Sequence, residues 1–141
     1  MNENVTDYAG VLNRHGIRLT AVRLLVFQAM DCFENTFSLA DLTEALDSVD
    51  KSTVFRTLTL FAQHHLVHEI EDGSGSTKYC LCHNDHECRV EELHCHFYCE
   101  GCHKTFCLEH THIPVVRYPE GFELHRIDYL LKGLCPECRK I

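Results

Sequence analysis

Residues 94–110, HCHFYCEGCHKTFCLEH, contain one half of the strongest signal in this sequence. Within it two residues separate Cys99 from Cys102, and the same spacing returns at Cys135 and Cys138. Two intervening residues let a tight turn direct both sulfurs at one ion, and two such turns complete a tetrahedron without an open position. The spacing therefore predicts a structural zinc site that stabilises the fold. A redox-active pair would need only one such motif, in a thioredoxin-like context that this sequence lacks.

The same stretch predicts a second metal site. His94 and His96 alternate, so on a strand both imidazoles point to one face, three residues before the first cysteine pair. Two exposed surface histidines are the alternative for such a pair taken alone. Further potential ligands accompany it in the sequence, namely His68, Cys82, Cys95, Cys107 and His125.

Length and composition bound the class of protein. The 141 residues suffice for one domain or two very small ones. The first ten residues show neither the basic nor the apolar segment of a signal peptide, and no apolar stretch approaches the roughly 18 residues that span a bilayer. We therefore expect a cytoplasmic protein without a membrane segment, whose ten cysteines bind metal rather than form disulfides. The net charge of −8 argues against nucleic acid as a partner, so DNA binding depends on where the few basic residues lie.

Residues 1–82 show the element order of a winged helix. A first helix is expected to end near Gly16, and a second covers residues 20–33 with Thr20 as its N-cap. Ser38 and Asp41 resemble a capping box that starts a short third helix, and a fourth helix covers residues 50–66. Two strands, 67–71 and 77–82, follow with a turn-rich segment between them. The apolar stripe predicted for the second helix consists of Val22, Leu25, Val26, Ala29, Met30 and Phe33.

The helix over residues 50–66 carries the candidate DNA-reading face. Opposite its apolar stripe it presents Phe55 and Arg56 side by side, which is unusual on a solvated face. A solvated helix charge is the alternative for Arg56. We expect Ser52, Thr53, Phe55 and Arg56 to enter a major groove, and Arg18 and Arg23 to lie near the DNA backbone or an adjacent minor groove.

The C-terminal part differs in character. Pro114, Pro119 and Gly121 exclude a long helix there, and residues 122–131 are predicted to form a strand.

Five motifs in this order resemble the ferric uptake regulator (Fur) family over nearly the whole chain. They are Gly16-x-Arg18-x-Thr20-x-x-Arg23, Ser38-x-x-Asp41-Leu42, Thr53-Val54-Phe55-Arg56-x-Leu58, His94-x-His96-x-x-Cys99-x-x-Cys102 with Lys104, and Gly133-x-Cys135-x-x-Cys138. The resemblance implies an α+β protein with a winged helix-turn-helix DNA-binding domain (1–82), a hinge or insertion (83–93) and a small α/β dimerisation domain stapled by zinc (94–141). It also implies a homodimer whose metal-bound form represses transcription at AT-rich inverted repeats in double-stranded operator DNA.

Departures from the family pattern favour zinc as the sensed metal. Thr36 stands where the iron sensors of the family place a histidine, Phe55 replaces a tyrosine, and Cys107 takes the place of a carboxylate ligand. The segment Tyr79-Cys80-Leu81-Cys82-His83 is similar to that of the zinc uptake regulators (Zur), whose sensing site takes a cysteine there. The resemblance implies a sensing site of His68, Cys82, His94 and His96, with Cys107 as an alternative ligand. Thiolates beside imidazoles select zinc over Fe(II).

Several alternatives stay open at this point. An iron- or other metal-responsive regulator is the nearest, and a zinc buffer or metallochaperone is a different class that has no use for the Phe55–Arg56 face. A hydrolytic metal enzyme is disfavoured, because the chain has no room for a cleft with a carboxylate base; we therefore expect no enzymatic activity. Cys95, His112 and His125 are candidates for a further metal site on spacing alone.

Overall fold

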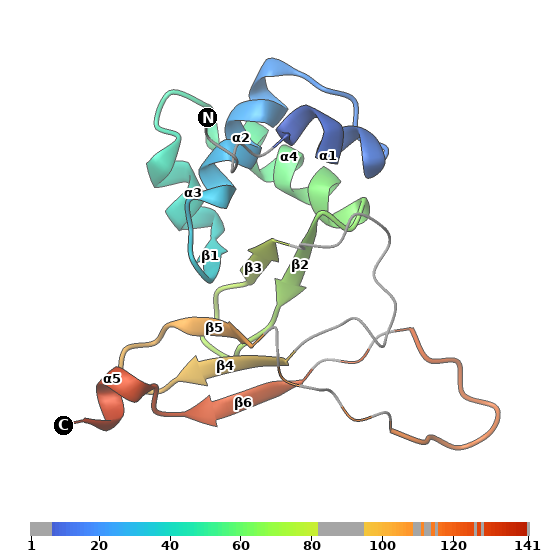
Figure 1. The fold of residues 1–141 in the computed structure, drawn as a ribbon, viewed down its shortest axis with the longest axis vertical. Helices are drawn as coiled ribbons and strands as arrows, with labels where there is room; N and C mark the ends of the chain where they lie inside the picture. The colour runs from blue at the N-terminus through green and yellow to red at the C-terminus, as the bar shows by residue number, and fades with distance from the viewer. Residues whose placement is uncertain are drawn as a thin grey trace.

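The computed structural model describes residues 7–81, 95–108, 111, 114, 116–125, 127 and 129–140. Four helices form its upper part in Figure 1: α1 (Tyr8–Arg14), α2 (Ala21–Asp31), α3 (Leu39–Ala45) and α4 (Lys51–Gln63). Beneath them lies the wing sheet, made of β1 (Thr36–Ser38), β3 (Lys78–Leu81) and β2 (Val67–Ile70) in that order. A C-terminal sheet follows, in the order β5 (Thr105–Leu108), β4 (Cys95–Cys99) and β6 (Leu130–Gly133), with the short α5 (Pro136–Arg139) at its end.

The starts of α2 and α3 follow from local hydrogen bonds, as the sequence predicts. Thr20 Oγ1 accepts from the Arg23 amide at the start of α2. At α3 the capping box is complete, because the Ser38 hydroxyl accepts from the Asp41 amide and the Asp41 carboxylate accepts from the Ser38 amide. Such pairs satisfy amides that a helix start would otherwise leave without partners.

The core of the N-terminal part lies between α2, α4 and the wing sheet. Val54, Leu58 and Phe61 of α4 are fully buried, as the predicted stripe requires. The stripe of α2 is rotated from the prediction: Val26, Phe27 and Met30 are buried, whereas Leu25 is 46% exposed. Phe27 packs edge-on against Phe61 of α4 with ring centroids 6.3 Å apart, which places Phe27 on the buried face of α2.

The wing sheet contains a strand that the sequence pattern did not indicate. β1 has only three residues and pairs antiparallel with β3, so that Thr36 lies opposite Cys80. β2 occupies the other side of β3, with His68 opposite Cys80. Cys80 is therefore flanked on both sides by paired strands.

The C-terminal sheet corrects the predicted strand over 122–131. The strand observed at that end of the chain is β6, Leu130–Gly133, which runs parallel to β4. Residues 122–125 are not in a strand, and Phe122 is 69% exposed. Pro119 and Gly121, with Gly121 at φ +95°, interrupt the extended backbone before it. The strand β5, paired antiparallel with β4, was not predicted.

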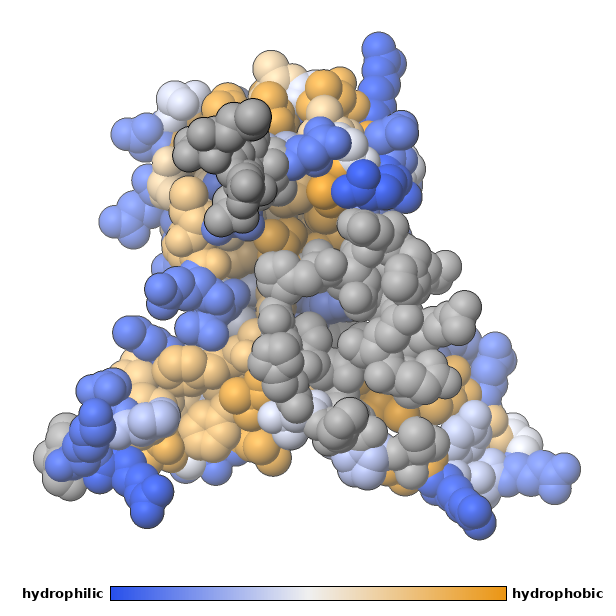
Figure 2. All heavy atoms as spheres, in the orientation of Figure 1, coloured by the Kyte–Doolittle hydropathy of each residue, from blue (hydrophilic) through white to orange (hydrophobic). Residues whose placement is uncertain are grey.

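Apolar side chains remain uncovered on the C-terminal part. Figure 2 shows them gathering over the C-terminal sheet on the face drawn there. The large exposed apolar residues of this region are Val116, Tyr118, Phe122, Leu124, Leu131 and Leu134. Among the described residues no helix is long and apolar enough to cross a membrane.

Candidate metal centres and nucleic-acid interface

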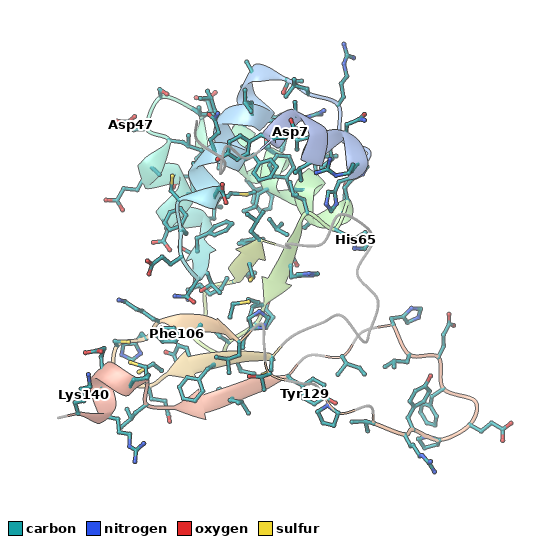
Figure 3. The ribbon with its side chains drawn as sticks, in the orientation of Figure 1. Asp7, Asp47, His65, Phe106, Tyr129 and Lys140 are labelled. Atoms are coloured by element: carbon teal, nitrogen blue, oxygen red, sulfur yellow. The ribbon has the colours of Figure 1, made fainter. Side chains whose placement is uncertain are left out.

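The four cysteines of the two predicted motifs come together at one end of the C-terminal sheet. Cys99 ends β4, Cys102 follows in the turn, and Cys135 and Cys138 lie at the start of and within α5. The parallel pairing of β4 with β6 sets Cys99 opposite Gly133, which brings the second motif beside the first. The four sulfurs lie within 4.8 Å of one another, and sulfur atoms are visible beside α5 in Figure 3.

The surroundings of this four-cysteine cluster fit a closed zinc site. The amides of Cys102 and Cys135 donate to Cys99 Sγ at 3.5 and 3.3 Å. These backbone bonds lower the pKa of Cys99 to about 6, which favours the thiolate that a metal requires. In the same cluster the pKa of Cys138 is raised, because its thiol donates to the sulfurs of Cys99 and Cys135. A Cβ on Gly101 would lie 2.9 Å from Cys138 Sγ, so the turn has room only for glycine.

A second group of potential ligands lies where the wing sheet meets the C-terminal sheet. It consists of Cys80 on β3, His96 on β4 and Cys107 on β5, whose ligand atoms are within 4.8 Å of one another. His96 and Cys107 are paired across β4 and β5, and Cys80 approaches them from the wing with its sulfur 3.2 Å from Cys107 Sγ. We call these three residues the inter-domain cluster.

The sequence analysis identified two members of this cluster and missed the third. His96 and Cys107 were predicted, whereas the wing cysteine was assigned to Cys82. Cys80 and Cys82 lie two positions apart and so share a face of an extended strand, which means that alternation alone could not choose between them. Cys82 and His94 lie outside the described residues, as does the predicted hinge 83–93. His68 is the cross-strand neighbour of Cys80 but does not belong to the cluster.

The further site predicted from Cys95, His112 and His125 is not assembled in the described part of the chain. Cys95 is buried and belongs to neither group of potential ligands. It is adjacent to His96 on β4, so its side chain leaves the opposite face of the sheet. His125 is exposed, with Nε2 3.9 Å from Glu123 Oε1, and His112 lies outside the described residues.

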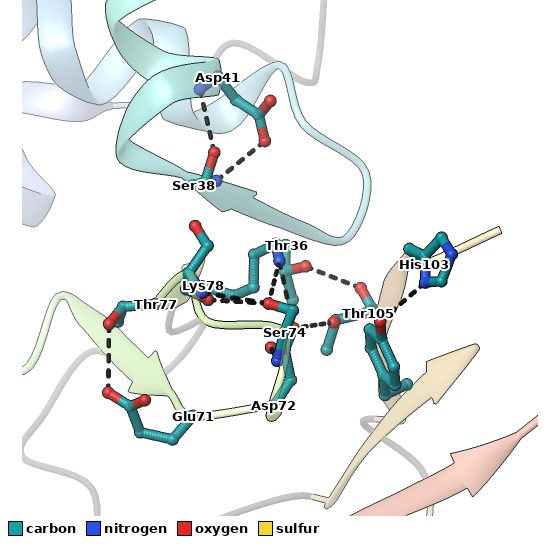
Figure 4. A network of polar contacts seen from close by, with 12 residues as sticks. Thr36, Ser38, Asp41, Glu71, Asp72, Ser74, Thr77, Lys78, His103 and Thr105 are labelled. Atoms are coloured by element: carbon teal, nitrogen blue, oxygen red, sulfur yellow. Dashed lines mark hydrogen bonds and ion pairs between the residues drawn. The ribbon is translucent and has the colours of Figure 1, made fainter. Parts of the chain in front are cut away.

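A polar network centred on the buried Asp72 joins the two sheets next to the inter-domain cluster (Figure 4). Thr105 Oγ1 of β5 donates to Asp72 Oδ2 at 2.6 Å, and Thr36 Oγ1 of β1 donates to the Thr105 carbonyl at 2.8 Å. Lys78 Nζ lies 3.2 Å from the same carboxylate oxygen, and the Ser74 amide donates to Oδ1 at 2.9 Å. We call these five residues the Asp72 network.

The Asp72 network keeps its carboxylate charged. Asp72 is 1% exposed, and this burial alone would raise its pKa. Hydrogen bonds from Ser74, Thr105 and Lys78 outweigh burial and lower the pKa from 3.8 to about 2. The charge therefore persists throughout the neutral range and anchors the turn 72–76 to β5.

The candidate DNA-reading face is presented as predicted. Ser52, Phe55 and Arg56 are exposed on α4, Phe55 with 49% of its surface accessible. Arg56 Nη2 donates to Thr53 Oγ1 at 3.3 Å, a bond within one turn of the helix that leaves other guanidinium donors available. Arg23 differs from this picture, because its Nη1 donates to the Arg18 carbonyl at 2.8 Å and holds the segment before α2.

Comparison with known proteins points in one direction. The model of the ferric uptake regulator family matches residues 14–126. The ferric uptake regulation protein of Synechococcus elongatus is 29% identical over 140 residues, which cover 92% of this chain and 90% of that protein. A zinc uptake regulator solved with zinc and DNA has a TM-score of 0.66 at 22% identity, covering 92% of this chain and 89% of that chain. The ferric uptake regulator of Pseudomonas aeruginosa, solved with manganese, has a TM-score of 0.64 at 20% identity, covering 93% and 99%. At these identities the two structures show a common fold.

Proposed function

Because this chain belongs to the ferric uptake regulator family, whose members are metal-responsive transcriptional regulators and not enzymes, we propose that it is a zinc-responsive repressor. It binds operator DNA as a homodimer when its inter-domain cluster holds metal. The observation that carries this proposal is the convergence of Cys80, His96 and Cys107 from the wing and the C-terminal sheet. A cytoplasmic location is part of this proposal, because a transcriptional regulator acts where the DNA is.

The donor set of the inter-domain cluster supports zinc rather than iron. Two cysteine sulfurs and one imidazole are softer donors than the carboxylates and imidazoles that suit Fe(II). The zinc uptake regulator with this fold was solved with zinc and DNA together, whereas the Pseudomonas regulator was solved with manganese. His68, Cys82 and His94 are proposed as additional ligands. The four-cysteine cluster is proposed to hold a structural zinc with no exchangeable position.

Zinc bound by the inter-domain cluster would cross-link the wing to the C-terminal sheet. Cys80 would supply the wing side, and His96 and Cys107 would supply the other side. A shift from mostly open to mostly closed molecules needs a preference of about 10⁴-fold, or about 5.5 kcal/mol. Loss of the Cys80 ligand on opening contributes to that difference, whereas the contacts of the Asp72 network shift the starting population toward the closed arrangement.

The homodimer places two copies of α4 against successive major grooves. The exposed apolar residues of the C-terminal part supply a surface for a second copy, because monomers rarely leave large apolar patches uncovered. Two-fold symmetry in the protein then matches an inverted repeat in the DNA, proposed to be AT-rich. Ser52, Thr53, Phe55 and Arg56 are the proposed reading residues, with Arg18 and Arg23 near the backbone or an adjacent minor groove.

Fluorescence anisotropy with labelled operator fragments in metal-buffered solutions tests the proposal. We expect tight binding at lower free zinc than free Fe(II), and loss of zinc dependence in Cys80→Ser and His96→Ala. Cys32→Ser is the matched control, because Cys32 is exposed after α2 and belongs to neither group of potential ligands. Activation by Fe(II) at lower free concentration would instead make the chain an iron-responsive regulator. Zinc binding without any DNA binding would point to a buffer or metallochaperone.

Metal content separates the two clusters. Cys99→Ser is expected to lose one zinc per chain and to destabilise the dimer, since a structural zinc site contributes folding free energy. Cys80→Ser is expected to lose the more readily chelated ion and to remain a folded dimer. A folded Cys99→Ser dimer with unchanged zinc content would contradict the structural role.

A further inference from the structure

The inter-domain cluster contains two sulfurs from different domains that are unusually close. Cys80 donates its thiol hydrogen to Cys107 Sγ at 3.2 Å. Two sulfurs on one tetrahedral zinc, each at about 2.3 Å from the ion, would lie about 3.8 Å apart. A disulfide bond needs about 2.05 Å. The observed separation lies between the two, so either bridge requires only a small displacement of β3 relative to β5.

Solvent reaches this pair through a hollow on the surface. The hollow has a volume of about 260 Å³, and the residues that line it include Cys80 and Cys107 together with the acidic residues Asp31 and Glu34. Cys107 is half-buried, whereas Cys80 is 2% exposed. A small neutral oxidant can therefore approach Cys107 first, and the carboxylates disfavour anionic oxidants.

We propose that, when no metal occupies the inter-domain cluster, Cys80 and Cys107 are a modification site at which hydrogen peroxide forms a disulfide. The Cys107 thiolate attacks one peroxide oxygen and breaks the O–O bond, which gives a sulfenic acid and a hydroxide that takes up a proton. The Cys80 sulfur then attacks the sulfenic sulfur, the S–S bond forms, and water leaves with the thiol proton. Two thiols are oxidised, and one peroxide is reduced to two water molecules.

The disulfide and the regulatory metal exclude each other. This consequence rests on the proposed function, because the same two sulfurs are the proposed zinc ligands. Once Cys80 and Cys107 are joined, neither can supply a thiolate, and DNA affinity no longer responds to zinc. Reduction by a dithiol restores the response. Peroxide would thus act on the zinc response at the same contact between the wing and the C-terminal sheet.

Peptide mapping of the full chain tests the modification site directly. The regulatory metal is removed by mild chelation, retention of the structural zinc is verified by metal content, and the protein is treated with hydrogen peroxide and then N-ethylmaleimide. Without reduction, trypsin should release peptide 105–117, in which Cys107 is the sole cysteine, linked to peptide 79–89 through Cys80. The link should be lost in Cys80→Ser and kept in Cys32→Ser.

Four outcomes test this inference and separate it from the proposed function. Attachment of Cys107 to Cys82 or Cys88 in the wild type would overturn the assignment, as would a Cys107 that stays alkylated by N-ethylmaleimide while the four-cysteine cluster oxidises. Prior loading with zinc should suppress the link. If the link forms equally fast with zinc bound, the two sulfurs are not the zinc ligands, and the mutual exclusion fails although the modification site stands. Absence of DNA binding would count against the proposed function alone.

Discussion

Replacing Thr105 by valine removes one hydroxyl from the Asp72 network and leaves the shape of the side chain nearly unchanged. Thr105 is 3% exposed, and its hydroxyl donates to the buried carboxylate of Asp72 at 2.6 Å. A hydrogen bond to a charged group contributes about 1.5–3 kcal/mol. Lys78 and the Ser74 amide still donate hydrogen bonds to the Asp72 carboxylate in the variant, so each domain should remain folded.

The lost free energy applies to the closed arrangement alone. Asp72 is hydrated when the wing moves away from β5, so the open arrangement gains water in place of the hydroxyl. A metal held from both sides requires closure, and its apparent affinity therefore falls by the same free energy. At about 1.4 kcal/mol for each factor of ten, Thr105→Val should weaken apparent zinc affinity by about ten- to a hundredfold.

Zinc-buffered titrations read out through DNA anisotropy measure this shift, with structural zinc content checked in each variant. Thr77→Val is the matched control, because its hydroxyl also donates to a carboxylate, that of Glu71 at 3.1 Å, but in an exposed position. It should leave the zinc midpoint nearly unchanged. Thr36→Val, which loses a 2.8 Å bond to a backbone carbonyl, should fall between the two. Equal midpoints for Thr105→Val and Thr77→Val would refute the reasoning.

Three other predictions concern separate parts of the molecule. Arg56→Ala should reduce specific DNA binding by about 1–3 kcal/mol if Arg56 contacts a base, or lower the salt slope by about 1 if it contacts phosphate; unchanged affinity and slope would show that it contacts neither. Gly101→Ala should weaken zinc retention against a chelator and destabilise the fold by about 1–3 kcal/mol, because the new Cβ meets Cys138 Sγ at 2.9 Å; retention like that of the wild type would show that the turn has room. The pKa of Asp72 lies at about 2 in the folded chain against an ordinary 3.8, so its ionisation stabilises the fold by about 2 kcal/mol above pH 4, and this stability is lost as the pH falls toward 2. Acid unfolding of Asp72→Asn should show a shallower slope in that window, and an identical slope would contradict the assignment.

Local features of this fold were predictable from the sequence. The capping box at Ser38, the N-cap at Thr20 and the apolar period of α4 each depend on residues within one or two helical turns. The two cysteine motifs were equally predictable, because the two-residue spacing that a tight turn requires is a local feature of the sequence. That the two motifs would form one cluster could be predicted from the motifs alone, whereas the strand pairing that brings them together, β4 with β6, could not.

Features that depend on distant pairing were missed. β1 has three residues, too few for alternation to be recognised, and it is a strand only because β3 supplies its hydrogen bonds. The strand predicted over 122–131 is shorter and later, because pairing with β4 begins at Leu130. The convergence of Cys80 with His96 and Cys107 was missed for a related reason, because it depends on where β5 comes to lie against the wing, which no local pattern encodes.

Thr36 illustrates how a departure from the family pattern would change the energetics of the proposed switch. The iron sensors that the sequence resembles place a histidine at this position. Here the Thr36 hydroxyl reaches the Thr105 carbonyl of β5 directly, at 2.8 Å. Such a bond contributes about 0.5–1.5 kcal/mol to the closed arrangement whether or not metal is present. A shift from mostly open to mostly closed molecules requires the metal to bind the closed arrangement more tightly than the open one by about 5.5 kcal/mol. A direct contact instead moves the starting population toward closure, so a cluster with fewer ligands can complete the shift.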